Sequence, residues 1–452
     1  MLKSINPYTG ETLEKFKEHS KSDVSKKIKK ADKTFKDWKH TTFARKSELM
    51  HNLAEELINN KKDYATAITK EMGKPIAQAI AEIEKCAWVC NYYAEHAENQ
   101  LKKEIIETDA QESYVRFDPL GVILAVMPWN YPFWQVFRFI APALMAGNVG
   151  VLKHASNVMR CAENIEKAIQ NAGFPDGCFQ NLIISSKKVE NIIRDKRIKA
   201  VTLTGSKPAG SAVASIAGEE IKKSLLELGG SNALVVFEDA NIEESVKTCV
   251  QARFQNTGQS CIAGKRLLVH ESIYNEVVEA LITETRELKS GDPLEEDTFI
   301  GVMAREDLAK DLEDQLNRAI QGGAKVVLGG KRNKTYFEPT IVINVSKKSP
   351  IFLEETFGPL ISVTSFKTDM EAIDLVNKSD FGLGVSVFTE DFERAKALIS
   401  QFDDGAVFIN SMVKSDPRLP FGGTKDSGYG RELSSDGIKE FLNRKTVYIN
   451  KF

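Results

Sequence analysis

The chain has 452 residues, with 61 Lys and Arg against 63 Asp and Glu, which gives a formal net charge of −2. This balance excludes the strongly basic surface that is typical of a nucleic-acid-binding protein. The chain begins without a charged segment followed by an apolar one, and its apolar runs are too short to span a bilayer, so we expect a cytoplasmic protein that makes no membrane contact.

The length suggests about three domains. Three helices are predicted in the first hundred residues, at 23–39, 44–60 and from 74 to the region of His96, because apolar residues recur there at helical spacing or follow a Gly-Lys-Pro break. From residue 113 onward, short apolar strands alternate with helical tracts. Such alternation predicts an α/β fold with a parallel sheet covered on both faces.

Two sets of strands are expected. The first set is predicted at 113–117, 122–127, 149–153, 182–184 and 200–203, with helices at 134–146, 162–171 and 189–195. The second set is predicted at 233–237, 265–269, 326–328, 361–366, 385–388 and 406–409. A last strand at 446–450 alternates polar and β-branched residues and stands alone after a helix.

The six cysteines, at 86, 90, 161, 178, 249 and 261, form no C-x-x-C pair and no Cys/His cluster with the spacing of a zinc site. We therefore expect free thiols in a reducing compartment and no bound metal. A single cysteine in such a chain is more often inert core than a catalyst. Cys261 differs because it lies in a loop of small and polar residues, F-Q-N-T-G-Q-S-C-I-A-G-K-R at 254–266.

Two further segments supply the partners that a reactive thiol needs. Glu227 stands among apolar residues before Gly229-Gly230, a pair that we expect to be flexible, and such surroundings should raise the pKa of the carboxyl toward neutrality. Asn130 is fixed between two prolines, so its amide has a restricted position from which to donate hydrogen bonds. A thiol, a base and an amide donor together are the parts needed for acyl chemistry.

These segments resemble the aldehyde dehydrogenases. The matching motifs run in the family's order over nearly the whole chain: P-W-N-Y-P at 128–132, T-G-S at 204–206, L-E-L-G-G at 226–230, G-Q-S-C at 258–261, E-E-T-F-G-P at 354–359 and P-F-G-G-T-K-D-S-G-Y-G-R-E at 420–432. One departure is Ser231, where the family most often has lysine.

The resemblance implies a fold with an atypical Rossmann-like cofactor domain, an α/β catalytic domain and a β arm for oligomerisation. The expected boundaries are 1–103 and 120–228 for the cofactor domain, 229–429 for the catalytic domain, and 104–119 and 442–452 for the arms. It also implies a homodimer or homotetramer.

The resemblance also assigns roles. Cys261 would add to an aldehyde, Asn130 would hold the oxyanion, Glu227 would activate water, and Lys153 would contact the cofactor ribose. No G-x-G-x-x-G or G-x-x-x-x-G-K-S/T motif is present, so the cofactor site rests on the resemblance. Its expected residues are Trp129, Lys153, Ser156, Gly205, Ser206, Gly210, Leu228, Glu355 and Phe357.

Ser156 bears on the choice of cofactor. Relatives that prefer NAD+ often carry Glu there, whose carboxylate would repel a 2′-phosphate. We expect NADP+ to be preferred and NAD+ to be accepted; the alternative is that Ser156 only leaves space and both are used.

The segments W-N-Y-P-F-W-Q-V-F-R and L-K-H-A-S-N resemble short bacterial succinate-semialdehyde dehydrogenases. Arg138, Trp134, Gln135 and Arg418 are expected to bind a small aldehyde that carries a distal carboxylate. A second arginine of some relatives is replaced by Gln255, and Arg418 could equally be a solvated loop residue. The alternatives are a broad-specificity aliphatic or amino-aldehyde dehydrogenase, in which Arg138 is only structural, and a non-catalytic homologue.

Overall fold

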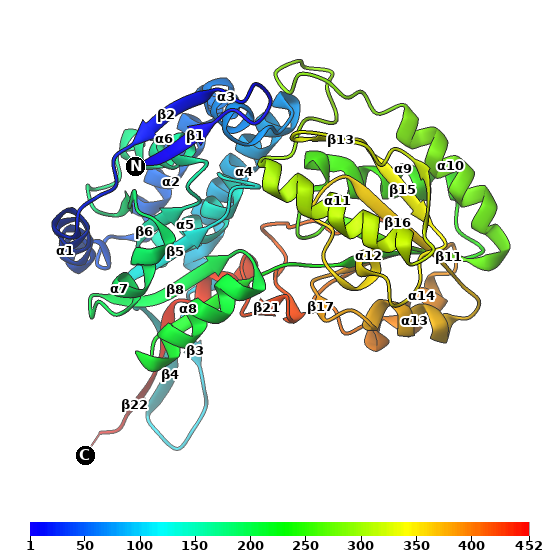
Figure 1. Cartoon of the computed structure of the whole chain (residues 1–452). Coiled ribbons are helices and arrows are strands. Elements are labelled where there is room, and N and C mark those ends of the chain that lie inside the picture. Colours follow the sequence, from blue (N-terminus) through cyan, green and yellow to red (C-terminus); the bar gives the residue numbers. More distant parts are fainter. Residues whose placement is uncertain (452) are drawn as a thin grey trace.

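The computed structural model describes residues 1–451 as two lobes with an arm that projects from one of them (Figure 1). Each lobe is built on one large sheet with helices on both faces, so the α/β fold that the sequence predicts is confirmed. Within the described residues, no helix combines the length and apolarity needed to cross a bilayer.

The N-terminal segment packs on the first lobe. A hairpin of β1 (Leu2–Ile5) and β2 (Thr12–Phe16) precedes four helices: α1 (Lys21–Trp38), α2 (Phe43–Asn59), α3 (Lys61–Met72) and α4 (Ile76–Gln100). The helix α1 starts where a capping box forms between Ser20 and Asp23. The predicted helices correspond to α1, α2 and α4, whereas α3 was missed.

The first large sheet has six strands in the order β21-β9-β8-β5-β6-β7. Its strands are β5 (Val122–Met127), β6 (Val149–His154), β7 (Phe179–Asn181), β8 (Ile198–Thr204), β9 (Lys223–Glu227) and β21 (Gly428–Tyr429), and only β21 runs antiparallel. The helices α5 (Trp134–Met145), α6 (Met159–Asn171), α7 (Val189–Ile193) and α8 (Lys207–Glu219) connect them.

The strand predicted at 182–184 is wrong by three residues. The ladder with β6 pairs Phe179, Gln180 and Asn181, and the apolar residues that follow are buried beyond it. The strand β9 was not predicted.

The second large sheet has seven strands in the order β12-β15-β16-β11-β10-β18-β19. They are β10 (Asn232–Val236), β11 (Gly264–His270), β12 (Lys325–Leu328), β15 (Thr340–Ile343), β16 (Leu360–Phe366), β18 (Val385–Phe388) and β19 (Val407–Ile409), with β12 antiparallel to β15. The covering helices are α9 (Ile242–Phe254), α10 (Tyr274–Arg286), α11 (Glu306–Gln321), α12 (Pro350–Leu353), α13 (Asp369–Asn377) and α14 (Phe392–Leu398). Separate apolar clusters fill its two faces.

The arm joins segments that are far apart in the sequence. The strand β22 (Leu442–Ile449) pairs with β4 (Glu112–Pro119) from Leu442 opposite Pro119 to Ile449 opposite Glu112, and β3 (Glu104–Ile105) lies on the other side of β4. The helix α15 (Ser434–Lys439) leads into it. The domain boundaries expected from the sequence remain a prediction; the three sheets follow them except at β21, which belongs to the first sheet although it lies within 229–429.

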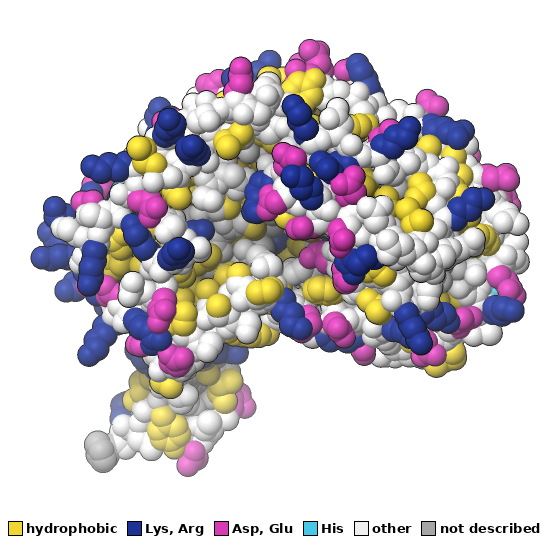
Figure 2. Space-filling model, viewed as in Figure 1, with side chains coloured by type: hydrophobic (Ala, Val, Ile, Leu, Met, Phe, Trp, Pro, Cys, Tyr) yellow, Lys and Arg dark blue, Asp and Glu magenta, His cyan; other side chains and the backbone are white. Residues whose placement is uncertain are grey.

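The remaining elements are short. They are the strand pairs β13 (Arg332–Asn333) with β14 (Tyr336–Phe337) and β17 (Phe381–Gly382) with β20 (Thr424–Lys425), and the 3-10 helices η1 (Ser186–Lys188), η2 (Gln255–Gly258), η3 (Glu271–Ile273) and η4 (Ile399–Gln401). Figure 2 shows acidic and basic side chains interspersed over both lobes and a hollow between them.

Candidate active site

The loop that presents Cys261 is held in a strained conformation. Asn256, Thr257 and Gly258 have φ values of 56°, 54° and 70°, a left-handed turn that costs the two non-glycine residues about 1–3 kcal/mol each. Tertiary hydrogen bonds offset this cost: Asn256 N donates to Gln78 Oε1 at 2.7 Å, and Thr257 Oγ1 accepts from Gly301 N at 3.1 Å. The loop is therefore fixed by contacts from outside it.

The ammonium group of Lys265 fixes the loop that carries Cys261, which we call the nucleophile loop. It is buried and donates to the carbonyl oxygens of Ser260 and Cys261, both at 2.7 Å, and to Glu355 Oε1 at 3.1 Å. The same Glu355 oxygen accepts from Gly230 N at 3.0 Å. Sequence reasoning missed Lys265; its place four residues after the candidate nucleophile was the available signal.

Gly230 is required for close packing and not for flexibility. Its φ is not positive, but a Cβ at this position would lie 2.5 Å from the carbonyl oxygen of Cys261. The expected flexible role of this glycine is therefore wrong, because the turn after Glu227 packs directly on the nucleophile loop.

The Cys261 side chain is half-buried, whereas the other five cysteines are fully buried, and all six are free thiols. It lines a cavity of about 230 Å³. Burial raises the pKa of the Cys261 thiol to about 11, although the positive charges of Arg138 and Lys265 oppose the increase. At neutral pH the thiol is thus protonated and must lose a proton before it can react.

Glu227 ends β9 and is buried. Its Oε1 has no hydrogen-bond partner among residues 1–451, and burial raises the pKa of this carboxyl well above its usual value. The sequence predicted this shift, and its direction is confirmed. A carboxyl group in such a setting can take a proton near neutral pH.

Two N–H donors lie in the same region. The amide nitrogen of Asn130 donates to Gln259 O at 3.1 Å, which leaves its second hydrogen free. The backbone N–H of Cys261 has no acceptor within the described residues. Both can donate to an oxyanion that forms beside the Cys261 thiol.

Arg138 lines the cavity together with Trp134 and Gln135, but its charge is already balanced. Its guanidinium group forms a buried ion pair with Glu432, lies 3.4 Å from Thr204 Oγ1 and stacks on Phe421 at 4.5 Å. The cavity thus contains this arginine as expected, with a carboxylate partner that the sequence did not indicate.

Lys85 is the cation that sequence reasoning missed. It projects from α4 into the cavity, lies over the indole ring of Trp134 at 4.3 Å, and has no carboxylate partner within residues 1–451. Burial lowers the pKa of its ammonium to about 8. The available signal was a lysine one helical turn after Glu82, on a face of α4 that also carries Gln78.

Ser415 completes a small anion-binding arrangement. Its hydroxyl oxygen accepts from Lys85 Nζ and from Trp134 Nε1, both at 3.0 Å. A hydroxyl has two acceptor positions and one hydrogen, so with both lone pairs engaged the hydrogen is left to donate. Lys85 and Ser415 therefore offer donors to a negatively charged group in the cavity.

The structure does not bring Arg418 to this cavity. Its guanidinium group pairs with Asp416 at 2.7 Å and lies over Trp88, with 66% of the side chain exposed. Gln255, by contrast, lines the cavity.

The expected cofactor residues surround the ends of β6 and β8. Trp129 and Phe357, from the two lobes, meet edge to face at 5.7 Å, and Glu355 is held by Lys265 and Gly230. Lys153 is half-buried at the end of β6 and has no hydrogen bond or ion pair within residues 1–451; Ser156 follows and is exposed.

His154 adds no charge there. It is buried, accepts from Ala155 N at 2.9 Å and donates to Pro132 O at 2.9 Å, and burial lowers its pKa to about 4.

The turn from β8 into α8 fits a dinucleotide phosphate. Ser206 is the N-cap of α8, and its side chain caps no backbone N–H, so the first-turn donors remain available. Gly210 lets α8 approach Leu228, because a Cβ there would lie 2.6 Å from a methyl group of that leucine. Gly205 precedes the helix, and Lys153, whose side chain has no partner within residues 1–451, lies near the end of β6 in the same sheet. These described residues fit a nicotinamide dinucleotide.

The model of the aldehyde dehydrogenase family matches residues 1–447. The chain belongs to the aldehyde dehydrogenase family. A curated relative from Synechocystis sp., named probable succinate-semialdehyde dehydrogenase (NADP+), is 48% identical over 451 residues, with 99% of each chain covered. The succinate-semialdehyde dehydrogenase (NADP+) 1 of Mycobacterium tuberculosis is 46% identical over 455 residues, again with 99% of each covered.

A solved structure also agrees with the assignment to this family. The succinic semialdehyde dehydrogenase from Streptococcus pyogenes, crystallised in complex with NADP+ as the cofactor, superposes with a TM-score of 0.97 at 36% identity and covers 100% of both chains. The aldehyde dehydrogenase fold inferred from the motifs is therefore confirmed.

The raised pKa of Cys261 predicts how its reactivity depends on pH. In the cofactor-free enzyme, the rate of alkylation by iodoacetamide should rise about tenfold per pH unit between pH 7 and pH 9, because the thiolate fraction grows by that factor below the pKa. Mass spectrometry of the alkylated peptide measures the rate, and Cys261→Ala provides the control. A rate that is constant across this range would show that the thiolate is already formed at pH 7.

Proposed function

We propose that this protein oxidises succinate semialdehyde to succinate with NADP+ as the preferred cofactor. The observation that carries the proposal is the pair formed by Lys85 and Ser415, which places free donors for a carboxylate in the same cavity as Cys261. The cavity, about 230 Å³ in volume, suits a short substrate. The names of the relatives from Synechocystis and Mycobacterium agree with this substrate.

The charges of the cavity argue against the alternatives. An amino-aldehyde would bring a second cation beside Lys85, and the one carboxylate in the lining, that of Glu82, is already engaged. It pairs with buried Lys74 and accepts from the backbone of Phe133 at 2.9 Å and Trp134 at 3.0 Å. An uncharged aliphatic aldehyde would leave the half-buried ammonium of Lys85 without an ion-pair partner.

Arg138 has a supporting role in this proposal. Its positive charge lies close enough to lower the pKa of both Cys261 and Glu227, and Glu432 keeps it in place. It remains a candidate second ligand of the substrate carboxylate, as the sequence suggested. A non-catalytic homologue is disfavoured, because Cys261, Glu227 and Asn130 converge.

The reaction follows from these groups. The Cys261 thiol releases its proton to solvent water and its sulfur bonds to the aldehyde carbon, while Asn130 Nδ2 and the Cys261 N–H donate to the resulting oxyanion. A bound nicotinamide would supply the hydride acceptor through which this thiohemiacetal is oxidised to a thioester. Glu227 then takes a proton from water, the hydroxide attacks the thioester carbon, and the carbon–sulfur bond breaks to release the acid.

Trp129, Lys153, Ser156, Gly205, Ser206, Gly210, Leu228, Glu355 and Phe357 are proposed to hold the cofactor. Ser156 is small and exposed next to the cation of Lys153, so a 2′-phosphate meets a hydroxyl donor and no carboxylate. NAD+ would fit the same site without the gain from the phosphate.

The arm is proposed to join subunits into a homodimer or homotetramer. Ile105, Ile106, Tyr448 and Ile449 expose between 41% and 61% of their surface on it, and a subunit contact would cover these apolar side chains. The cofactor and catalytic domains are proposed to be 1–103 with 120–228, and 229–429.

The order of the chemical steps can be tested by two substitutions. Cys261→Ala should abolish oxidation. Glu227→Gln should keep a burst of one reduced cofactor per site while steady turnover falls by about 10²- to 10⁴-fold, because the base is needed only after the thioester has formed. Stopped-flow absorbance measures both, and a Cys261→Ala enzyme with wild-type turnover would contradict the mechanism.

The carboxylate site is tested at Lys85. Lys85→Met should lower kcat/KM for succinate semialdehyde by roughly 10- to 150-fold, as expected for loss of a charge-assisted hydrogen bond of roughly 1.5–3 kcal/mol, and leave butanal little affected. Lys85→Arg should retain part of the activity. Lys414→Met removes an equal charge from the exposed rim of the same cavity and should have little effect. Equal losses on both aldehydes in Lys85→Met would mean that Lys85 only supports the fold.

Cofactor choice is tested at Ser156. Ser156→Glu should shift the NADP+ to NAD+ preference by roughly a hundredfold toward NAD+, because a carboxylate beside the 2′-phosphate is repulsive. Ser156→Ala, which removes only the hydroxyl, should cause a much smaller shift. A wild-type enzyme that uses NAD+ alone would contradict the argument.

A further inference from the structure

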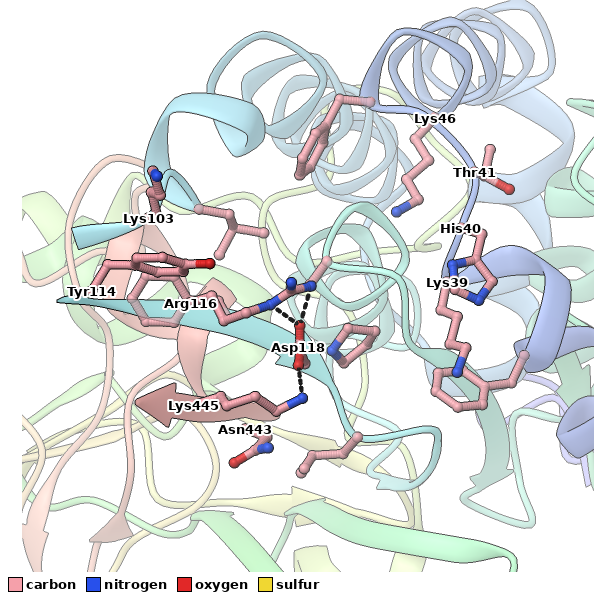
Figure 3. Close-up of a pocket in the computed structure, with 17 residues that line it drawn as sticks. Lys39, His40, Thr41, Lys46, Lys103, Tyr114, Arg116, Asp118, Asn443 and Lys445 are labelled. Atoms are coloured by element: carbon pink, nitrogen blue, oxygen red, sulfur yellow. Dashed lines mark hydrogen bonds and ion pairs between the residues drawn. The ribbon is translucent and has the colours of Figure 1, made fainter. Parts of the chain in front are cut away.

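A second and larger cavity lies at the base of the arm, where β4 and β22 meet the loop between α1 and α2 (Figure 3). Its volume is about 820 Å³, and it shares no lining residue with the cavity around Cys261. Nothing in the proposed oxidation uses it.

The walls of this cavity are strongly basic. They contain five Lys or Arg side chains, Lys39, Lys46, Lys103, Arg116 and Lys445, against one lining carboxylate, Asp118, although Lys103 also pairs with Glu112 at 2.8 Å. Asp118 is already engaged by Arg116 at 2.7 Å and by Lys445. Figure 3 shows Lys39, His40 and Lys46 on one side and Arg116, Asp118 and Lys445 on the other.

The burial of Lys46 is not expected for a lysine on a solvated basic surface. Its residue is only 4% exposed, yet its ammonium has no hydrogen bond or ion pair to any of residues 1–451. Its neighbours are the rings of Phe43 and Trp38, at 5.2 Å and 5.7 Å. Buried ammonium groups are normally paired, so this one lacks a counter-charge that the chain does not supply.

The start of α2 adds to the positive character. Thr41 and Phe43 line the cavity, and α2, with 17 residues, begins between them, so the positive end of its dipole lies at the wall. The cations and the helix start face one open cleft from different elements. One monovalent ion would balance only part of this charge.

We propose that this cavity is a binding site for a small anion that carries two or more phosphate groups. Lys46 would contact one phosphate group from the buried side of the cavity. Lys39 and the first turn of α2 would contact a second, and Arg116 and Lys445 line the opposite wall. The site is separate from the dinucleotide site, since none of its residues belongs to the proposed cofactor set.

The affinity should fall as pH rises. The pKa of Lys46 is lowered to about 8 by burial, so its charge is largely present at pH 7 and largely lost at pH 9. The titratable and charged side chains that surround it are Lys39, His40, Lys103, Arg116, Asp118, Cys178 and Lys445. If the affinity no longer depends on pH in Lys46→Met, the pH dependence is due to Lys46.

Inorganic pyrophosphate is the probe, titrated by calorimetry into the full-length protein saturated with NADP+ so that the dinucleotide site is filled. We expect binding at least tenfold tighter than that of orthophosphate, and a loss of at least tenfold in affinity in the double variant Lys39→Met/Lys46→Met. The matched control, Lys29→Met/Lys33→Met, removes two exposed lysines of α1 outside the cavity and should bind as wild type does.

Two other interpretations of the cavity predict different experimental results. If Lys46 only supports the fold, Lys46→Met will unfold at a lower temperature than wild type without ligand; the proposal expects no such loss, because an unpaired buried charge is removed. If the cavity is instead filled by a second copy of the chain, pyrophosphate will bind equally to the double variant and the control, and only the mass in solution will differ between them. Either result overturns the proposal.

Discussion

The ammonium group of Lys265 is the contact on which the active site depends. It is buried beneath the nucleophile loop and binds two consecutive carbonyl groups of that loop and the carboxylate of Glu355, which in turn receives the N–H of Gly230. Three segments that are distant in the sequence, around Gly230, Cys261 and Glu355, thus meet at one positive charge. Because a buried charge is stable only while its partners stay in place, the geometry of Cys261 is tied to the integrity of the whole network.

Several buried charges around the Cys261 cavity are balanced by ion pairs, whereas the Lys85 ammonium is not. Arg138 has Glu432, Glu82 has Lys74, and Lys265 has Glu355. Lys85 donates to the Ser415 hydroxyl and lies over the Trp134 ring, and it forms no ion pair within residues 1–451, although the carboxylates of Glu82 and Asp416 are close enough to act on its pKa. Selectivity for an anionic substrate follows from this difference, since a substrate carboxylate gains most beside a cation whose charge is still uncompensated.

The sequence could predict the α/β fold, most strands of the second sheet and the central strands of the first, because these depend on apolar periodicity. It could not show that Arg138 is paired, since Glu432 lies almost three hundred residues further along the chain. It missed Lys85 for a similar reason: a lysine on a helix is ordinarily solvated, and only the packing of Trp134 and Ser415 against it makes it half-buried. The misplaced strand near residue 182 reflects a choice between adjacent apolar segments that strand pairing alone decides.

The short strand β21 gives the chain an unusual order of assembly during synthesis. It comes from residues 428 and 429 but pairs with β9, directly beside Glu227. At about 5–20 residues per second, the ribosome adds the intervening two hundred residues in roughly 10–40 s. During that time β9, which carries Glu227, has no β21 to pair with. The nascent first lobe therefore stays open at this edge of its sheet until the rest of the protein has emerged.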